Sequence, residues 1–161
     1  MRLQQSVEIS IRRATDADID GVLACLQLAF EPYKASYTPA AYEDTVPTLS
    51  GVEQRLREMC VLVAVNQTNE ILGTLAYQVM KNNEGHLRGM AILPQWQRRG
   101  LAKRLLDRAE SDLRESKCNR CTLDTTPQLT NAIRFYESNG YIATRKSDLF
   151  GVPLIDYVKQ L

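Results

Sequence analysis

The chain has 161 residues, a length typical of one domain with a core of its own. Twenty lysines and arginines balance nineteen aspartates and glutamates, and a net charge of +1 excludes bulk electrostatic binding to nucleic acid or to an anionic membrane. Hydrophobic residues make up 44% of the chain, and no run of them approaches the ~18 apolar residues of a membrane span. We therefore expect a single domain over residues 1–161, with no nucleic-acid or membrane partner.

The N-terminus and the cysteines indicate the compartment. The first residues, MRLQQSVEISIRR, lack the apolar core of a signal peptide. The four cysteines fall in predicted helices and strands, and Cys118-x-x-Cys121 has neither a second such pair nor enough histidines to complete a metal site. We expect ordinary buried or half-buried thiols, no metal and a cytoplasmic location.

The first half of the chain combines strand and helix patterns. Thr15, with Asp18 three residues later, resembles a capping box at the start of a helix. Between residues 31 and 49 the apolar periodicity is lost, which predicts a long loop with at most a turn of helix. The predicted elements are a strand at 7–12, a helix at 19–30, the loop at 31–49, a helix at 51–59, and a hairpin of strands at 60–66 and 71–80.

The second half alternates strands and helices. Leucines and an alanine at i, i+4 steps predict a helix over 101–115, with charges on its other face. The further predicted elements are a turn at 81–85, a strand at 87–93, a strand at 118–124, a helix at 130–138, and strands at 141–144 and 155–159. This order predicts an α/β fold with a mixed sheet.

Residues 86–106 contain the most informative pattern of the chain. A strand stopped by Pro94 is followed by the turn Gln97-Arg98-Arg99-Gly100 and then by the start of a helix. The first N–H groups of a helix have no internal partner and carry partial positive charge, and Gly100 lets a ligand approach the main chain closely. Neither the P-loop pattern nor the dinucleotide fingerprint is present. The segment therefore predicts a different kind of phosphate site, with counter-charge from Arg98, Arg99, Lys103 and Arg104.

The pattern Met90-x-Ile92-x-Pro94, followed by Gln97-x-x-Gly100-x-Ala102, resembles the acetyl-CoA loop of the GNAT superfamily of N-acetyltransferases. The resemblance implies the family's mixed, mostly antiparallel central sheet flanked by helices, with acetyl-CoA as co-substrate. It implies that the loop binds the pyrophosphate, largely through main-chain N–H groups, while the preceding strand pairs with the pantetheine. The cofactor-binding residues implied are Met90, Ala91, Ile92, Gln97, Arg98, Arg99, Gly100, Leu101, Ala102 and Lys103.

A second segment, Ala132-x-x-Phe135-Tyr136-Glu137-x-x-Gly140-Tyr141, resembles the family signature whose tyrosine lies near the CoA sulfur. The resemblance implies that Tyr136 is the acid that protonates the departing thiolate. The alternative role for Tyr136 is packing on an amphipathic helix. Many relatives have an asparagine seven residues before this tyrosine, where this chain has Leu129, and the nearest asparagine is Asn131.

Three residues are candidates for the base that deprotonates the acceptor. His86 lies six residues before Ile92 and, by strict alternation, on the same strand face; some relatives have a glutamate base at this position. Asp124, twelve residues before Tyr136, matches a second position where relatives have an acidic base, and Glu84 is the third candidate. The alternatives are that His86 is merely exposed or hydrogen-bonded, or that no dedicated base exists.

Together these patterns predict an N-acetyltransferase that moves an acetyl group from acetyl-CoA to a primary amine by direct attack in a ternary complex. The acceptor, a small molecule or a peptide, is expected between residues 31–49 and the C-terminal segment. The side chains there that either hold a cationic amine or form a solvated loop are Tyr33, Tyr37, Tyr42, Glu43 and Asp44. Transfer of another acyl group and a non-catalytic CoA-binding regulatory module are the alternatives, and a homodimer remains open.

Overall fold

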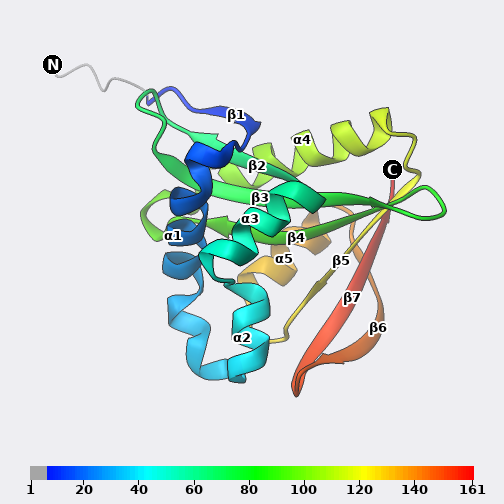
Figure 1. Cartoon of the computed structure of the whole chain (residues 1–161). Coiled ribbons are helices and arrows are strands. Elements are labelled where there is room, and N and C mark those ends of the chain that lie inside the picture. The colour runs from blue at the N-terminus through cyan, green and yellow to red at the C-terminus, as the bar shows by residue number, and fades with distance from the viewer. Residues whose placement is uncertain (1–6) are drawn as a thin grey trace, which may run out of the picture.

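A mixed sheet forms the centre of the molecule (Figure 1). The computed structural model describes residues 7–161. Within them the strand order is β1-β2-β3-β4-β5-β7-β6, and β4 and β5 are the one parallel pair. The strands are β1 (Ser10–Arg13), β2 (Cys60–Val65), β3 (Ile71–Met80), β4 (Glu84–Ile92), β5 (Arg120–Thr125), β6 (Ile142–Leu149) and β7 (Val152–Gln160). This mostly antiparallel sheet confirms the predicted fold class.

Helices cover both faces of the sheet. Figure 1 shows α1 and α3 in front of the sheet, and α4 and α5 behind it. On the front face Cys25 of α1 lies against the main chain of Ala91 in β4, and on the back face Tyr77 of β3 donates a hydrogen bond of 2.8 Å to Asp112 of α4. The α-helices are α1 (Ile19–Phe30), α2 (Pro39–Thr45), α3 (Leu49–Glu58), α4 (Leu101–Glu115) and α5 (Thr130–Ser138).

Prediction and structure agree where periodicity and capping act together. The bounds of β3, α4 and α5 are the predicted ones. At the start of the first helical segment, the Thr15 N–H donates to the Asp18 carboxylate at 2.8 Å, as the capping box requires. The apolar positions of α4 are buried against the sheet, as their spacing predicts: Leu101, Leu105, Ala109 and Leu113.

The segment predicted as a loop, residues 31–49, holds more helix than expected. It contains a 3-10 helix, Glu31–Ser36, and then α2. Pro39 occupies the first turn of α2, where its fixed φ suits a helix start, and the Thr38 side chain accepts a hydrogen bond of 3.2 Å from the Ala41 N–H. Pro39 therefore begins a helix in a segment whose lack of apolar periodicity predicts a loop.

Several strands have bounds that differ from the predicted ones. The first strand begins at Ser10 and β5 at Arg120, each later than predicted, while β4 begins at Glu84, inside a predicted turn. The C-terminal strands β6 and β7 are both longer than predicted. Residues 142–148 of β6 are all exposed, so this strand has no apolar alternation from which its length could be predicted.

Strands β4 and β5 separate soon after they begin. Their parallel pairing covers three residue pairs, which are Glu84 with Arg120, Gly85 with Cys121, and His86 with Thr122. Beyond these pairs β4 continues along β3, and β5 continues along β7. The sheet therefore opens between its two central strands, which leaves β4 an edge of the kind that the resemblance assigns to the pantetheine.

A bulge in β4 corrects one prediction about this strand. Ala76 pairs with Arg88 and Thr74 pairs with Ala91, so β4 has one more residue than β3 between these pairs. Gly89 takes up the extra length with a φ of +66°. The bulge reverses the alternation, and the prediction that His86 and Ile92 share a face is wrong. His86, Arg88 and Ala91 share the front face.

The described residues also bear on membranes, metals and thiols. No helix within residues 7–161 is long and apolar enough to cross a membrane, and these residues hold no cluster of His, Cys, Asp or Glu arranged for a metal ion. Cys25, Cys118 and Cys121 are buried free thiols and Cys60 is half-buried, in agreement with the prediction. The first six residues of the stretch that lacks a signal-peptide core lie outside the described residues.

A buried ion pair joins α4 to the far half of the open sheet. Lys159 of β7 donates to both carboxylate oxygens of Glu110 at 2.7 and 2.9 Å, and the Tyr141 hydroxyl donates to the same carboxylate at 3.3 Å. Glu110 is 3% exposed. Because α4 packs on β2, β3 and β4, this contact bridges the two halves.

We expect Glu110→Ala to lower the free energy of unfolding by about 3 kcal/mol, because it leaves a partly buried ammonium without a counter-charge. Urea unfolding followed by circular dichroism measures this. The control is Asp107→Ala, which removes the exposed pair with Lys103 and costs less than about 1 kcal/mol. Similar small losses in both variants would contradict the bridging role.

Candidate active site

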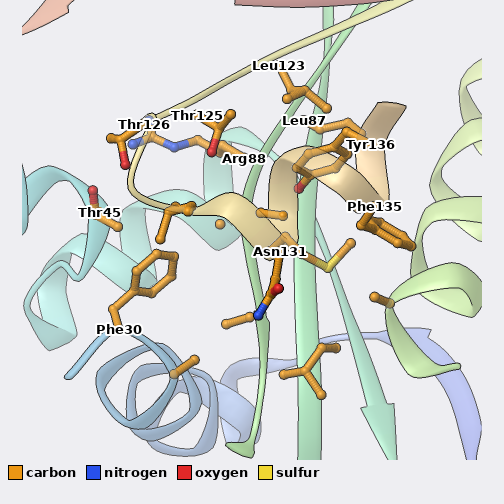
Figure 2. A pocket seen from close by; sticks show the side chains of 18 of the residues that line it. Phe30, Thr45, Leu87, Arg88, Leu123, Thr125, Thr126, Asn131, Phe135 and Tyr136 are labelled. Carbon is orange, nitrogen blue, oxygen red and sulfur yellow. The ribbon is translucent and has the colours of Figure 1, made fainter. Parts of the chain in front are cut away.

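A cavity of about 1100 Å³ opens where β4 and β5 separate. Its walls come from α1, β4, the loop before α4, β5 and α5. Figure 2 shows Phe30 of α1 on one side of the cavity, and Asn131, Phe135 and Tyr136 of α5 on another. The sequence-predicted residues that line the cavity are His86, Met90, Ala91, Ile92, Gln97, Arg98, Gly100, Leu101, Ala102, Lys103, Asp124 and Tyr136.

The loop between β4 and α4 is held by its own glutamine and glycine. The Gln97 side-chain N–H donates to the Ile92 carbonyl at 3.2 Å, which ties the loop back to the end of the strand. Gly100 has a φ of +80° and stands at the N-cap of α4. An added Cβ at Gly100 would meet no atom within 4 Å, so this side of the loop is open to a ligand.

The N-terminus of α4 supplies hydrogen-bond donors at this opening. The first helical bond joins the Arg104 N–H to the Gly100 carbonyl at 3.2 Å. The N–H groups of Leu101, Ala102 and Lys103 therefore have no partner inside the helix, and the helix dipole adds partial positive charge there. This arrangement suits an anion such as a pyrophosphate.

The basic side chains of the loop differ in position. Arg98 and Lys103 line the cavity, although Lys103 also pairs with Asp107 on the next turn of α4. The Arg99 guanidinium lies over the Trp96 ring at 4.8 Å and is not part of the wall. The role of Arg99 in cofactor binding stays a prediction.

The inner edge of β4 carries main-chain groups toward the cavity. Met90, Ala91 and Ile92 lie in the stretch that has separated from β5. The register also leaves Gly89 and Met90 outside the ladder with β3, because the bulge lies there. Main-chain donors and acceptors without strand partners are available to an extended ligand such as a pantetheine arm.

Tyr136 brings a phenol to the α5 side of the cavity (Figure 2). Its ring packs edge-to-face on Phe135 and Tyr141, with centroid distances of 5.4 and 5.7 Å. Within residues 7–161 the hydroxyl has no hydrogen-bond partner. Burial holds the pKa of Tyr136 well above its usual range, so the hydroxyl keeps its proton at neutral pH. The raised pKa makes Tyr136 a weaker acid than a free phenol, so its proton can pass to a thiolate only where the same burial also raises the proton affinity of that thiolate.

His86 presents one ring nitrogen as a proton acceptor. The Thr122 hydroxyl donates to the Gly85 carbonyl at 3.3 Å, so it accepts from His86 Nδ1–H, 2.9 Å away. With Nδ1–H as the donor to Thr122, the lone pair of the ring lies on Nε2. Burial lowers the pKa of His86, which keeps the imidazole neutral at physiological pH.

Asp124 adds a carboxylate to the same side of the cavity as His86. Thr122 pairs with His86 across the sheet, and Asp124 follows two residues later on the same strand face. The cavity walls withhold bulk water from this carboxyl and raise the pKa of Asp124, an effect that His86 opposes when it is protonated. The third candidate, Glu84, forms an ion pair of 2.8 Å with Arg120 and does not line the cavity.

The aromatic and acidic residues predicted to hold the acceptor divide into two groups. Tyr33, Tyr37 and Asp44 line the cavity. Tyr42 packs instead against Tyr37 and beneath the Lys34 ammonium, and neither Tyr42 nor Glu43 reaches the cavity wall.

Sequence reasoning missed two arginines that line the cavity. Arg88 stands on β4, two residues after His86, and Arg55 stands on α3. The available signal was the position of Arg55 three residues after the buried Val52, on the core-facing side of a helix.

Comparison with known proteins agrees with this geometry. The family model described as the acetyltransferase (GNAT) family matches residues 22–141, a stretch that includes the loop, all three candidate bases and Tyr136. The uncharacterized protein YdhI of Bacillus subtilis (strain 168) is 29% identical over 87 residues, which are 54% of this chain and 52% of YdhI. The match thus spans about half the length of this curated relative.

Two solved structures have the same fold as this chain. A GNAT-family acetyltransferase from Staphylococcus aureus Mu50 superposes with a TM-score of 0.79 at 19% identity, over 96% of this chain and 99% of that one. The PaiA N-acetyltransferase of Thermoplasma acidophilum, solved in complex with coenzyme A, has a TM-score of 0.77 at 17% identity, over 96% and 99% of the two chains.

Proposed function

Because the chain belongs to the GNAT acetyltransferase family, we propose that it moves an acetyl group from acetyl-CoA to a primary amine by direct attack in a ternary complex. The observation that carries the proposal is one continuous cavity. It joins the anion-binding start of α4, the unpaired edge of β4, and the side chains of Tyr136 and His86. The coenzyme A complex of the structurally similar PaiA protein supports the choice of acyl carrier.

The proposed grip on acetyl-CoA uses the loop and the strand edge. The pyrophosphate lies at the main-chain N–H groups of Gly100 to Lys103, with Arg98 as a counter-charge. The pantetheine arm lies along Met90 to Ile92, and a main-chain N–H of this strand stabilises the developing oxyanion.

The chemical step involves two proton transfers. The amine nitrogen attacks the thioester carbon and forms the C–N bond of the amide. The C–S bond then breaks and releases the thiolate. His86 Nε2 takes the proton that the amine loses, directly or through a water, with Asp124 as the competing base. The departing thiolate takes the proton of the Tyr136 hydroxyl, which has no other acceptor within residues 7–161.

We expect acetyl-CoA at a hundred times its Kd to stabilise the protein by about 2.7 kcal/mol. The Gly100→Asp variant should lose this shift, because it places a carboxylate at the pyrophosphate and a side chain at a φ of +80°. Melting temperatures of both proteins with and without acetyl-CoA measure the effect. Gly100→Ala, which adds no charge, separates electrostatic exclusion from backbone strain. Equal shifts in wild type and Gly100→Asp would refute the loop assignment.

We expect Tyr136→Phe to lower kcat by about 10²- to 10⁴-fold while folding and acetyl-CoA binding survive, because the ring stays and the proton is lost. Thiol release with an accepted amine measures kcat. Phe135→Leu is the matched control for disturbed ring packing at the neighbouring position. An unchanged kcat in Tyr136→Phe would assign the tyrosine to packing, and binding without turnover in wild type would favour a regulatory CoA-binding module.

We expect kcat/KM to fall as pH falls through the lowered pKa of His86, below its ordinary value of 6.5, because the protonated imidazole cannot accept a proton. His86→Gln should remove this limb and reduce the rate. Asp124→Asn should move the limb to still lower pH, because the Asp124 charge raises the pKa of His86. Asp20→Asn, on the exposed side of α1, is the control. If Asp124→Asn removes the limb and His86→Gln keeps it, Asp124 is the base.

A further inference from the structure

Two guanidinium groups line one side of the cavity, away from the loop that begins α4. Arg88 comes from β4 and Arg55 from α3, so they approach the cavity from different elements. Arg55 is only 9% exposed. A charged side chain is rarely buried to this degree without a partner, so its neighbours define its role.

These neighbours leave the two arginines short of negative charge. Arg55 donates one hydrogen bond of 3.3 Å, to the main-chain carbonyl of Asp44, and has no carboxylate at ion-pair distance within residues 7–161. Arg88 donates to the same carbonyl and to the Asp44 carboxylate, both at 3.1 Å. Asp44 is the one carboxylate at ion-pair distance from either guanidinium within residues 7–161, with the charge of Asp124 acting on Arg88 from farther away, and most of the guanidinium N–H donors have no protein acceptor.

This side of the cavity has the chemistry of a carboxylate site. A guanidinium fork binds a carboxylate through paired, charge-assisted hydrogen bonds, and two forks on one wall select a planar anion over a neutral group. Burial and the neighbouring charge of Arg88 lower the pKa of Arg55 to about 10, so it stays charged at neutral pH but under electrostatic stress. A bound anion would offset both the burial of the Arg55 charge and its repulsion by Arg88.

A short distance along β4, the cavity has side chains that suit an amine and not an anion. His86 lies on the same face as Arg88, two residues away, which is about 7 Å along a strand. Asp124, which also lines the cavity, has no ion-pair partner within residues 7–161. A neutral imidazole and a free carboxylate suit an amine, and their separation from the arginines suits a molecule with an amine and an acid group a few bonds apart.

We propose that the acetyl acceptor is a free amino acid or a similarly small amino carboxylic acid, and that Arg55 and Arg88 bind its carboxylate while its amine faces His86 and Asp124. The inference rests on the proposed acetyl transfer and specifies its substrate class. An acceptor of this kind bridges the two charged sides of the cavity, whereas a simple amine or a lysine side chain leaves Arg55 without an anion and Arg88 with the Asp44 carboxylate alone.

Arg55 has a second set of contacts that the test must separate from substrate binding. A Cβ added to Gly89 would lie 2.8 Å from Arg55 Nη1, so the guanidinium covers the bulge of β4. Removal of Arg55 can therefore disturb the strand as well as a ligand. The Arg88 side chain lines the cavity and is partly exposed, so its substitution disturbs the strand less than removal of Arg55 does.

The experiment compares matched acceptors with acetyl-CoA: each amino acid against its carboxamide, which keeps the shape and the amine but removes the negative charge. Wild type should favour the acid in kcat/KM. In Arg88→Gln this preference should fall by about 10- to 100-fold, the worth of a charge-assisted hydrogen bond, and Arg88→Lys should restore part of it. Arg55→Lys, which keeps the charge, should weaken the preference with less risk to folding. Arg57→Gln, on the exposed side of α3, is the matched control and should leave the preference unchanged.

Two results would overturn the inference and leave the proposed function standing. The first is efficient acetylation of amines and amides with no preference for acids in wild type, or a preference that Arg88→Gln does not change. The second is an arginine-dependent preference for a dicarboxylic acyl-CoA over acetyl-CoA with a simple amine, which would assign the carboxylate to the acyl group. Absence of acetyl transfer to every amine and amino acid would instead overturn the proposed function itself.

Discussion

The separation of β4 from β5 is the constraint on which the rest of the site depends. Each strand keeps its outer partner to the end, since β4 pairs with β3 as far as Ile92 and β5 pairs with β7 as far as Thr125. Beyond His86 and Thr122 the facing edges of β4 and β5 no longer pair with each other. Main-chain groups inside a sheet need hydrogen bonds from some source, so this edge favours an extended ligand or water. One feature thus creates both the cavity and the donors and acceptors of its wall.

An open sheet needs a bridge between its halves, and α4 provides it. The helix packs over β2, β3 and β4, and Glu110 reaches across to Lys159 of β7 and to Tyr141. The same helix begins at Gly100, at the mouth of the cavity. The contact that holds the halves at a fixed distance and the helix end that suits an anion therefore belong to one rigid element. At the closed end of the opening, the Arg120–Glu84 ion pair of 2.8 Å joins the two strands.

Local patterns explain which parts could be predicted from the sequence. The loop and α4 were predictable because a glycine, a helix start and i, i+4 leucines act within a few residues of each other. The face of His86 was not, because a single inserted residue at Gly89 reverses the alternation, and a glycine in a strand marks a bulge or a close approach without deciding between them. The proximity of Arg55 to Arg88 depends on how α3 lies over β4, and no periodicity in the sequence predicts that contact.

The separation also explains how the proposed acid and the candidate bases line one cavity although they come from opposite faces of the sheet. Tyr136 arrives from α5 behind the sheet, while His86 and Asp124 lie on the front face. An unbroken sheet would keep them apart. No thiol lines the cavity within residues 7–161, and burial raises the pKa of the nearby Cys25 to about 12, which makes it a poor nucleophile. Cys25 is thus poorly suited to carry an acyl group, and the proposed function assigns attack on the thioester to the amine itself.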